Sequence, residues 1–124
     1  MATARIRVYQ YPTCSTCRKA LAWLKAKGIA VDAVHIVERT PSAAELKGLW
    51  KKSGLPIKKW FNTSGGSYRE GKWGDELAAG LTDDAALAAL ASDGKLIKRP
   101  IVDAGDVVLV GFDEERYRDA LAKR

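Results

Sequence analysis

Apolar and polar residues alternate near the start of the chain, and the pattern then changes to a helical period. The alternation over residues 5–9 predicts a β-strand. From residue 15 or 16 to 27 the apolar side chains recur at helical spacing, and Gly28 is of the type that commonly ends a helix. Residues 31–37 again read as a strand. The chain therefore opens β-α-β, an order that favours two parallel strands joined by the helix.

The middle of the chain reads as helical segments. Ser42 with Glu45 matches a capping box and predicts a helix that runs to about Ser53 and stops at Gly54. The segments that follow are, in order, a short helix at 56–61, a loop at 62–67, short helical pieces at 68–79, and a helix from the cap residue Thr82 to about Gly94.

The last third of the chain returns to strands. Residues 101–102 and 107–110 predict two strands joined by a hairpin turn at 103–106. Acidic residues at 113–115 and the basic pair Lys123–Arg124 are in the favourable charge order for the dipole of a final helix. The whole pattern predicts an α/β fold with a thioredoxin-like mixed sheet (β-α-β … α-β-β-α), as one domain over 1–124 with a helical insertion at about 40–80.

Length and composition limit the class of protein. The chain has 124 residues, of which 47% are hydrophobic and 29% charged, an ordinary balance for one globular domain. No stretch reaches the length of a membrane span. Residues 1–7 carry charge where a signal peptide needs an apolar run. We expect a cytoplasmic protein with no membrane partner.

The formal net charge is +6, but the basic residues are interspersed with acidic ones. The basic pairs, such as Lys58–Lys59 and Lys98–Arg99, do not form a long block with interleaved aromatic residues. Direct nucleic-acid binding is therefore not predicted. A positive field would still help to attract an anionic substrate.

The two cysteines, Cys14 and Cys17, are three positions apart, which does not fit a secreted disulfide scaffold. Together with the single histidine, His35, they fall short of the four ligands of a structural zinc site, so no metal site is predicted. A Cys-x-x-Cys pair between a strand and a helix is typical of a redox dithiol. Two inert, partly buried thiols are the plain alternative.

The predicted position of Cys14, just before the helix, favours its thiolate. Free backbone N–H groups and the helix dipole stabilise an anion there, and Arg18 adds positive charge in the first turn. Cys17 lies one turn further on the same face. We therefore expect Cys14 to attack and Cys17 to resolve the mixed disulfide.

At this point the sequence resembles the arsenate-reductase-like family, which includes ArsC-type reductases and the Spx transcription regulators. The resemblance covers nearly the whole chain, and the segments that carry it are Tyr11–Ala20, Phe61–Gly65, Lys98–Val102 and Val110–Phe112. It implies a thioredoxin-like fold with a helical insertion.

The resemblance also implies roles for single residues. Cys14 takes the position of the family's catalytic cysteine, Arg99 that of an arginine that binds an oxyanion, and Pro100 that of a cis proline beside the active site. ArsC-type reductases use three arginines around arsenate, and here the first falls at Asn62 and the third at Gly111. The segment that begins with Asn62 is expected either to line the site and donate hydrogen bonds to a substrate or to be a plain loop.

The expected function is a thiol-dependent reductase acting on a disulfide or a small oxyanion. Cys14, Cys17 and Arg99 would be catalytic, and Arg18, Asn62 and Pro100 would contact the substrate. No bound cofactor is expected, and glutathione, glutaredoxin or thioredoxin would supply electrons. Two alternatives remain open: a true arsenate reductase, and an Spx-like redox-switched regulator that binds RNA polymerase. For the regulator Gly54 matches a contact glycine, although it also reads as an ordinary helix cap.

Overall fold

A computed structural model describes residues 6–121. The expectations for the N-terminal segment 1–5 and for Lys123–Arg124 lie outside the described residues. The chain divides into two compact units, one formed by residues 6–35 with 99–121 and the other by Ile36–Lys98. The insertion predicted at 40–80 lies within the second unit. No helix in the described part is long and apolar enough to cross a membrane.

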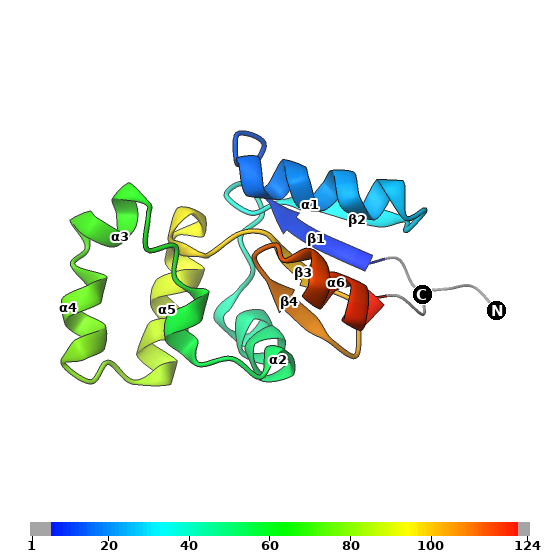
Figure 1. Cartoon of the computed structure of the whole chain (residues 1–124). Helices are drawn as coiled ribbons and strands as arrows, with labels where there is room; N and C mark the ends of the chain where they lie inside the picture. Colours follow the sequence, from blue (N-terminus) through cyan, green and yellow to red (C-terminus); the bar gives the residue numbers. More distant parts are fainter. Residues whose placement is uncertain (1–5, 122–124) are drawn as a thin grey trace. The chain divides into compact units, whose positions relative to one another are not determined.

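The first unit is built on one four-stranded mixed sheet. Its strands are β1 (Ile6–Gln10), β2 (Val31–His35), β3 (Ile101–Asp103) and β4 (Val108–Val110), in the order β2-β1-β3-β4 (Figure 1). β1 pairs with β2 in parallel and with β3 antiparallel, and β3 and β4 form the predicted hairpin. The thioredoxin-like arrangement of two parallel strands with a closing hairpin is therefore confirmed.

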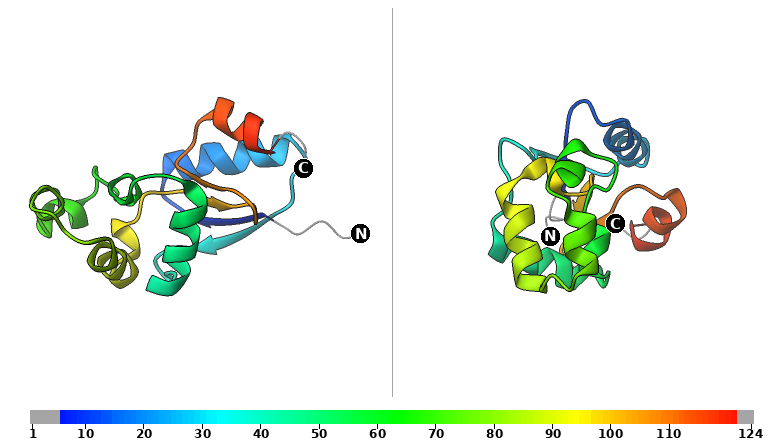
Figure 2. Two further views of the ribbon diagram at one scale, coloured as in Figure 1. Left: turned by 90° about the horizontal axis from the view of Figure 1, so that it is seen from below. Right: turned by 90° about the vertical axis from the view of Figure 1, so that its left-hand side faces the viewer.

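Two helices, α1 (Ser15–Ala26) and α6 (Glu114–Leu121), pack on the same face of this sheet. Figure 2 shows them beside each other over the strands. One buried cluster joins them to the sheet, and its members are Ile6, Val8, Ala20, Leu24, Val102, Leu109, Tyr117 and Leu121. The helical spacing of Ala20 and Leu24 is what turns one stripe of α1 toward the strands.

Strand β2 ends at His35, two residues earlier than the pattern predicts. The hydroxyl of Thr40 donates hydrogen bonds to the carbonyl groups of Ile36 (2.8 Å) and Val37 (3.1 Å), which closes a turn at that point. The alternation of apolar and polar residues does not reveal a side chain that takes backbone carbonyl groups away from strand pairing.

The second unit is helical. Its elements are α2 (Ala43–Ser53), the 3-10 turn η1 (Ile57–Trp60), α3 (Gly66–Glu70), α4 (Trp73–Ala78), α5 (Asp83–Ser92) and the 3-10 turn η2 (Gly94–Leu96). The predicted capping box of Ser42 and Glu45 is present, and Gly54 ends α2 at φ 68°. Thr82 caps α5 as predicted. The loop predicted at 62–67 is wrong in its last part, because α3 already begins at Gly66.

Helices α2 and α5 pack against each other. Beside them, a short antiparallel pairing ties η1 to the end of the unit: Phe61 bridges Ile97, and the amide of Lys98 donates to the Trp60 carbonyl at 2.8 Å. The Trp60 indole is buried and donates to the Ser53 hydroxyl at 3.1 Å. These contacts hold the segment from Lys58 to Phe61 and the segment ending at Lys98 in one place.

Candidate active site

Cys14 is the N-cap residue of α1. Its backbone is extended (φ −84°, ψ 114°), and its amide donates to the Tyr11 carbonyl at 3.0 Å, which closes the turn after β1. The amide of Cys17 points at the Cys14 Sγ at 3.3 Å. An N-cap side chain normally supplies an oxygen to these otherwise unpaired amides, and here a half-exposed sulfur takes that place.

This position favours the thiolate of Cys14. Burial of the sulfur opposes ionisation, but hydrogen bonds from Cys17 and from the Arg99 guanidinium outweigh it, and the positive charge of Arg99 adds to them. The pKa of Cys14 is therefore lowered from its ordinary value. A half-exposed thiol with a lowered pKa has the two properties that a nucleophilic cysteine needs.

Cys17 has the opposite environment. Its side chain is 0% exposed. Burial, and then the hydrogen bond with Cys14, raise the pKa of Cys17 to about 12. The pair thus consists of one accessible, acidic thiol and one shielded, neutral thiol, which is the asymmetry that an attacking and a resolving cysteine would have.

Arg99 reaches this site through the register of the sheet. Tyr9 of β1 is paired with Ile101 of β3, so the antiparallel chains bring the residues before β3 beside the residues after β1. The Arg99 guanidinium lies over the ring of Tyr11, 4.9 Å from its centre. The Arg99–Pro100 peptide bond is cis, and Pro100 is buried.

The aromatic ring of Tyr11 makes two contacts near this site. The ring of Tyr11 meets the ring of His35 edge to face, with the centres 5.4 Å apart. Tyr11 therefore contacts both the imidazole of His35 and the guanidinium of Arg99. Sequence reasoning gave Tyr11 no role, although its place in the turn before Cys14 is a signal that could have drawn attention to it.

Tyr117 is the second residue that sequence reasoning missed. It is 1% exposed, and burial, followed by the nearby Cys17 thiol, raises the pKa of its hydroxyl. That hydroxyl donates to the carbonyl of Gly111. Nothing in the pattern of the final helix separates this tyrosine from an ordinary core residue.

Other predicted site residues lie elsewhere or are engaged with the chain itself. The side chain of Arg18 is exposed. Its backbone amide donates a hydrogen bond to the Cys14 carbonyl at 3.1 Å. Asn62 lies in the second unit, where its side-chain amide donates to the Lys95 carbonyl at 3.3 Å. The substrate contacts expected of both residues stay predictions.

Gly111 stands where the family's third arginine was expected. It has φ 80°, a left-handed conformation that glycine adopts without strain, and its amide donates to the Pro100 carbonyl at 2.8 Å. The backbone at this position is therefore shaped for glycine, and no side chain is present to help Arg99 hold an anion.

Metal ligands do not gather here: within residues 6–121 no three His, Cys, Asp or Glu side chains lie close enough to hold one ion.

Comparison with known proteins decides the family. The family model described as ArsC family matches residues 9–120. The chain belongs to the ArsC family. Its thioredoxin-like fold is shared by the solved structure of an ArsC family related protein from Bacteroides fragilis, which superposes with a TM-score of 0.90 at 42% identity and covers 95% of this chain and 98% of that one.

Its relatives include reductases and a regulator. The chain is 49% identical over 111 residues to the uncharacterized protein YusI of Bacillus subtilis (90% of this chain, 93% of that protein). It is 33% identical over 117 residues to an arsenate reductase of Neisseria meningitidis (94% and 97%). It is also 28% identical over 109 residues to the regulatory protein MgsR of Bacillus subtilis (88% and 84%).

Proposed function

We propose that this ArsC-family protein is a cytoplasmic thiol-dependent reductase in which Cys14 attacks the substrate and Cys17 resolves the product. The observation that carries the proposal is the contrast between the two thiols: the pKa of half-exposed Cys14 is lowered, and the pKa of buried Cys17 is raised to about 12. A structural pair of cysteines needs no such contrast.

For a disulfide substrate the cycle balances as follows. The Cys14 thiolate attacks one sulfur, a mixed disulfide forms, and the other half of the substrate leaves as a thiolate. That leaving thiolate, or solvent, takes the proton of Cys17, whose sulfur then attacks Cys14 and releases the second half of the substrate. The substrate gains two electrons and the protein holds a Cys14–Cys17 disulfide. A dithiol such as thioredoxin or glutaredoxin, or glutathione, restores both thiols, and no bound cofactor takes part.

Arsenate is the less favoured substrate. An oxyanion with several negative charges needs several charged partners, and removing charged hydrogen-bond partners costs about 1.5–3 kcal/mol each. Of the three expected arginines only Arg99 is present, since Asn62 and Gly111 occupy the other two positions. Arg99 alone can still bind one carboxylate, or another group with a single negative charge, near the reacting sulfur. Arg18, Asn62 and Pro100 are the further substrate contacts that we propose.

A regulatory protein without turnover is the second hypothesis, and the similarity to MgsR favours it. In that case the Cys14–Cys17 pair would act as a redox switch on a contact with RNA polymerase. Gly54, the residue matched to that contact, caps α2 in the left-handed conformation, so its presence already has a structural cause.

The deciding experiment is steady-state turnover with a model disulfide, and with arsenate, using glutathione with glutaredoxin or thioredoxin with its reductase. We expect sustained consumption of reductant with the disulfide. Cys14→Ser should abolish it, while Cys17→Ser, treated with the disulfide in the absence of a donor thiol, should stop at a mixed disulfide on Cys14 that mass spectrometry detects. Arg99→Gln should slow turnover, and Lys25→Gln, which removes the same charge at the exposed far end of α1, should not.

Either of two results would refute the reductase. One is full activity in both cysteine variants. The other is absence of turnover with every donor, combined with co-purification of RNA polymerase that depends on the redox state of the pair; this result would establish the regulator instead.

A further inference from the structure

The second unit contains a pocket that the thiol chemistry does not use. Its volume is about 470 Å³, within the usual range for small-molecule sites. Every residue that lines it belongs to Ile36–Lys98, and the lining consists of Lys58, Lys59, Phe61, Thr63, Tyr68, Gly74, Leu77, Ala78 and Lys98.

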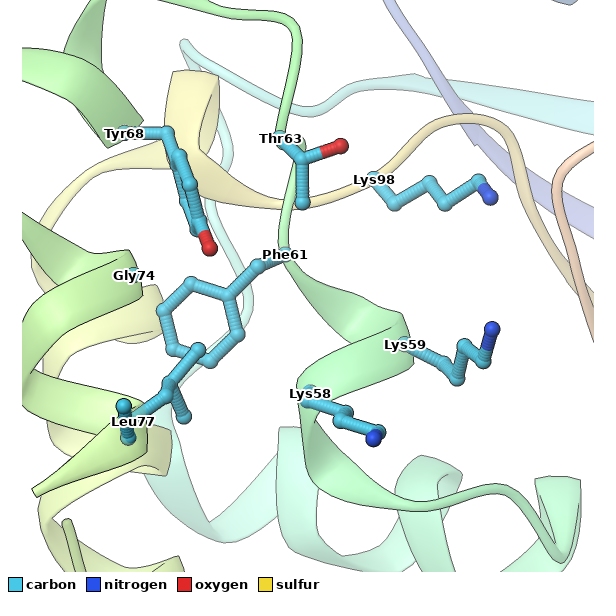
Figure 3. Close-up of a pocket in the computed structure, with 9 residues that line it drawn as sticks. Lys58, Lys59, Phe61, Thr63, Tyr68, Gly74, Leu77 and Lys98 are labelled. Atoms are coloured by element: carbon cyan, nitrogen blue, oxygen red, sulfur yellow. The ribbon is translucent and has the colours of Figure 1, made fainter. Parts of the chain in front are cut away.

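The pocket has a polar and an apolar side. Figure 3 shows the ring of Phe61 between Tyr68 and Leu77, while the side chains of Lys59 and Lys98 extend together on the other side. Phe61 is buried at the base, and its ring meets that of Tyr68 at 6.2 Å between centres. Tyr68 and Leu77 are half-buried and so present accessible aromatic and aliphatic surface.

The charge on the polar side is one-sided. All three lysines of the pocket are exposed, and none of them has an ion-pair partner within residues 6–121. None of the described lining residues is acidic. The hydroxyl group of Thr63 adds a hydrogen-bond donor, so the polar side offers a donor and positive charge to a ligand.

The backbone fixes these groups in place. Lys58 and Lys59 lie in η1. The backbone amide of Lys98 donates a hydrogen bond to the carbonyl of Trp60, the last residue of η1. The same backbone pairing continues with the Phe61–Ile97 bridge. It also includes the hydrogen bond that the backbone amide of Asn62 donates to the Leu96 carbonyl at 2.8 Å. The lysines that flank the pocket therefore start from a rigid base, although their ends are free to adjust.

We propose that this pocket binds a small organic anion that carries a planar apolar group. The anionic end would lie among the lysines, and the ring would lie against Tyr68 and Leu77. This assignment is independent of the proposed reductase activity.

The test uses the full-length reduced protein and amide NMR titrations with three probes: phenyl phosphate, inorganic phosphate and phenol. Only the first has both a charge and a ring. We expect phenyl phosphate to shift the amides of Phe61, Thr63, Tyr68 and Gly74 at lower concentration than either of the others. Added salt should weaken it, because exposed charges are screened. Shifts confined to residues 11–18 would report binding at the thiol site and would overturn the proposal.

Variants separate the two sides of the pocket. Lys98→Gln and Lys59→Gln should each weaken phenyl phosphate about fivefold. Lys51→Gln is the matched control, since it removes an exposed charge from α2 that does not line the pocket. Equal weakening by Lys51→Gln would show a general charge effect and would contradict the assignment.

Gly74→Ala tests the apolar side without harm to the helix. Gly74 lines the pocket, and a Cβ at this position would lie 3.1 Å from the Tyr68 hydroxyl oxygen, so the methyl group takes up pocket space and displaces the end of Tyr68 slightly. Because alanine favours a helix more than glycine does, the fold should be kept. We expect weaker phenyl phosphate binding with unchanged inorganic phosphate binding. If the unchanged protein bound phenyl phosphate no more tightly than inorganic phosphate, the ring would contribute nothing to binding and the proposal would be refuted.

Discussion

At the scale of single residues, the central feature is how few groups set the state of the Cys14 sulfur. Hydrogen bonds from the thiol and the amide of Cys17, together with the guanidinium of Arg99, overcome the burial that opposes ionisation. Cys17 lies in the first turn of α1, and Arg99 is brought beside the end of β1 by the pairing of β1 with β3. The reactivity of Cys14 should therefore respond to single substitutions.

Alkylation by iodoacetamide tests this directly. The rate for Cys14 should show a midpoint below about pH 8.5, the value of an unperturbed thiol. Arg99→Gln should raise that midpoint, because it removes a hydrogen bond and a positive charge, whereas Lys25→Gln should leave it in place. Peptide mapping should find Cys17 unmodified in the folded protein, since its side chain is fully buried. Equal labelling of both cysteines would contradict the assigned roles.

Tyr11 should act as a positioning residue for Arg99. A cation–π contact of this kind contributes about 0.5–1 kcal/mol at partly exposed sites. Tyr11→Leu should therefore raise the alkylation midpoint of Cys14 by up to about half a pH unit, while Tyr11→Phe, which keeps the ring under the guanidinium, should not. A residue that only supports the fold would change thermal stability in Tyr11→Leu without moving the midpoint.

At the scale of elements, the ends of the helices account for what the sequence predicts well. Ser42 and Thr82 are caps with visible chemistry, and Gly28 and Gly54 have positive φ where their helices stop. The start of α3 could not be predicted in this way. Its N-cap is Gly65, which has no side chain to form a capping hydrogen bond. The helix also follows a run of residues that is typical of a loop.

The capping box of α2 gives a prediction for stability. Ser42→Ala removes the hydroxyl that accepts the Glu45 amide at 3.1 Å, and it should cost about 1 kcal/mol and lower Tm by about 4 °C. Ser64→Ala is the control, because that exposed side chain makes no hydrogen bond in the part of the chain that the structure describes. Thermal unfolding followed by circular dichroism measures both. Equal losses in the two variants would mean that the cap contributes nothing.

At the scale of the whole molecule, the sequence predicts the sheet, but it does not predict which residues from distant parts of the chain meet at the site. Two parallel strands and a hairpin follow from local patterns. The approach of Arg99 to Cys14 depends on the pairing of Tyr9 with Ile101, a contact between distant parts of the chain that no local period reveals. Only the family resemblance implied it. Tyr117 and the lysine-flanked pocket likewise arise from packing, and the single-domain reading of 1–124 stays a prediction.

Two buried groups predict how the stability of the molecule depends on pH. The folded-state pKa of Cys17 is raised to about 12, and that of Tyr117 is raised as well, both mainly by burial. Because the folded protein favours their neutral forms, their contribution to stability is complete below the unfolded-state pKa values, about 8.5 and about 10. It is lost as the pH rises from there toward the folded-state values, by up to about 1.4 kcal/mol per pH unit for each group.

Cys14 has the opposite sign. Its folded-state pKa is lowered, so its contribution is present above the unfolded-state value and is lost as the pH falls through the folded-state value. Urea unfolding of the reduced protein across this range should therefore show the free energy of unfolding declining above about pH 8.5. Cys17→Ala should flatten the decline between about pH 8.5 and 10, where only the thiol of Cys17 contributes. If the variant declined as steeply as the unchanged protein, the shielded, neutral state assigned to Cys17, and with it the division of roles between the two thiols, would be wrong.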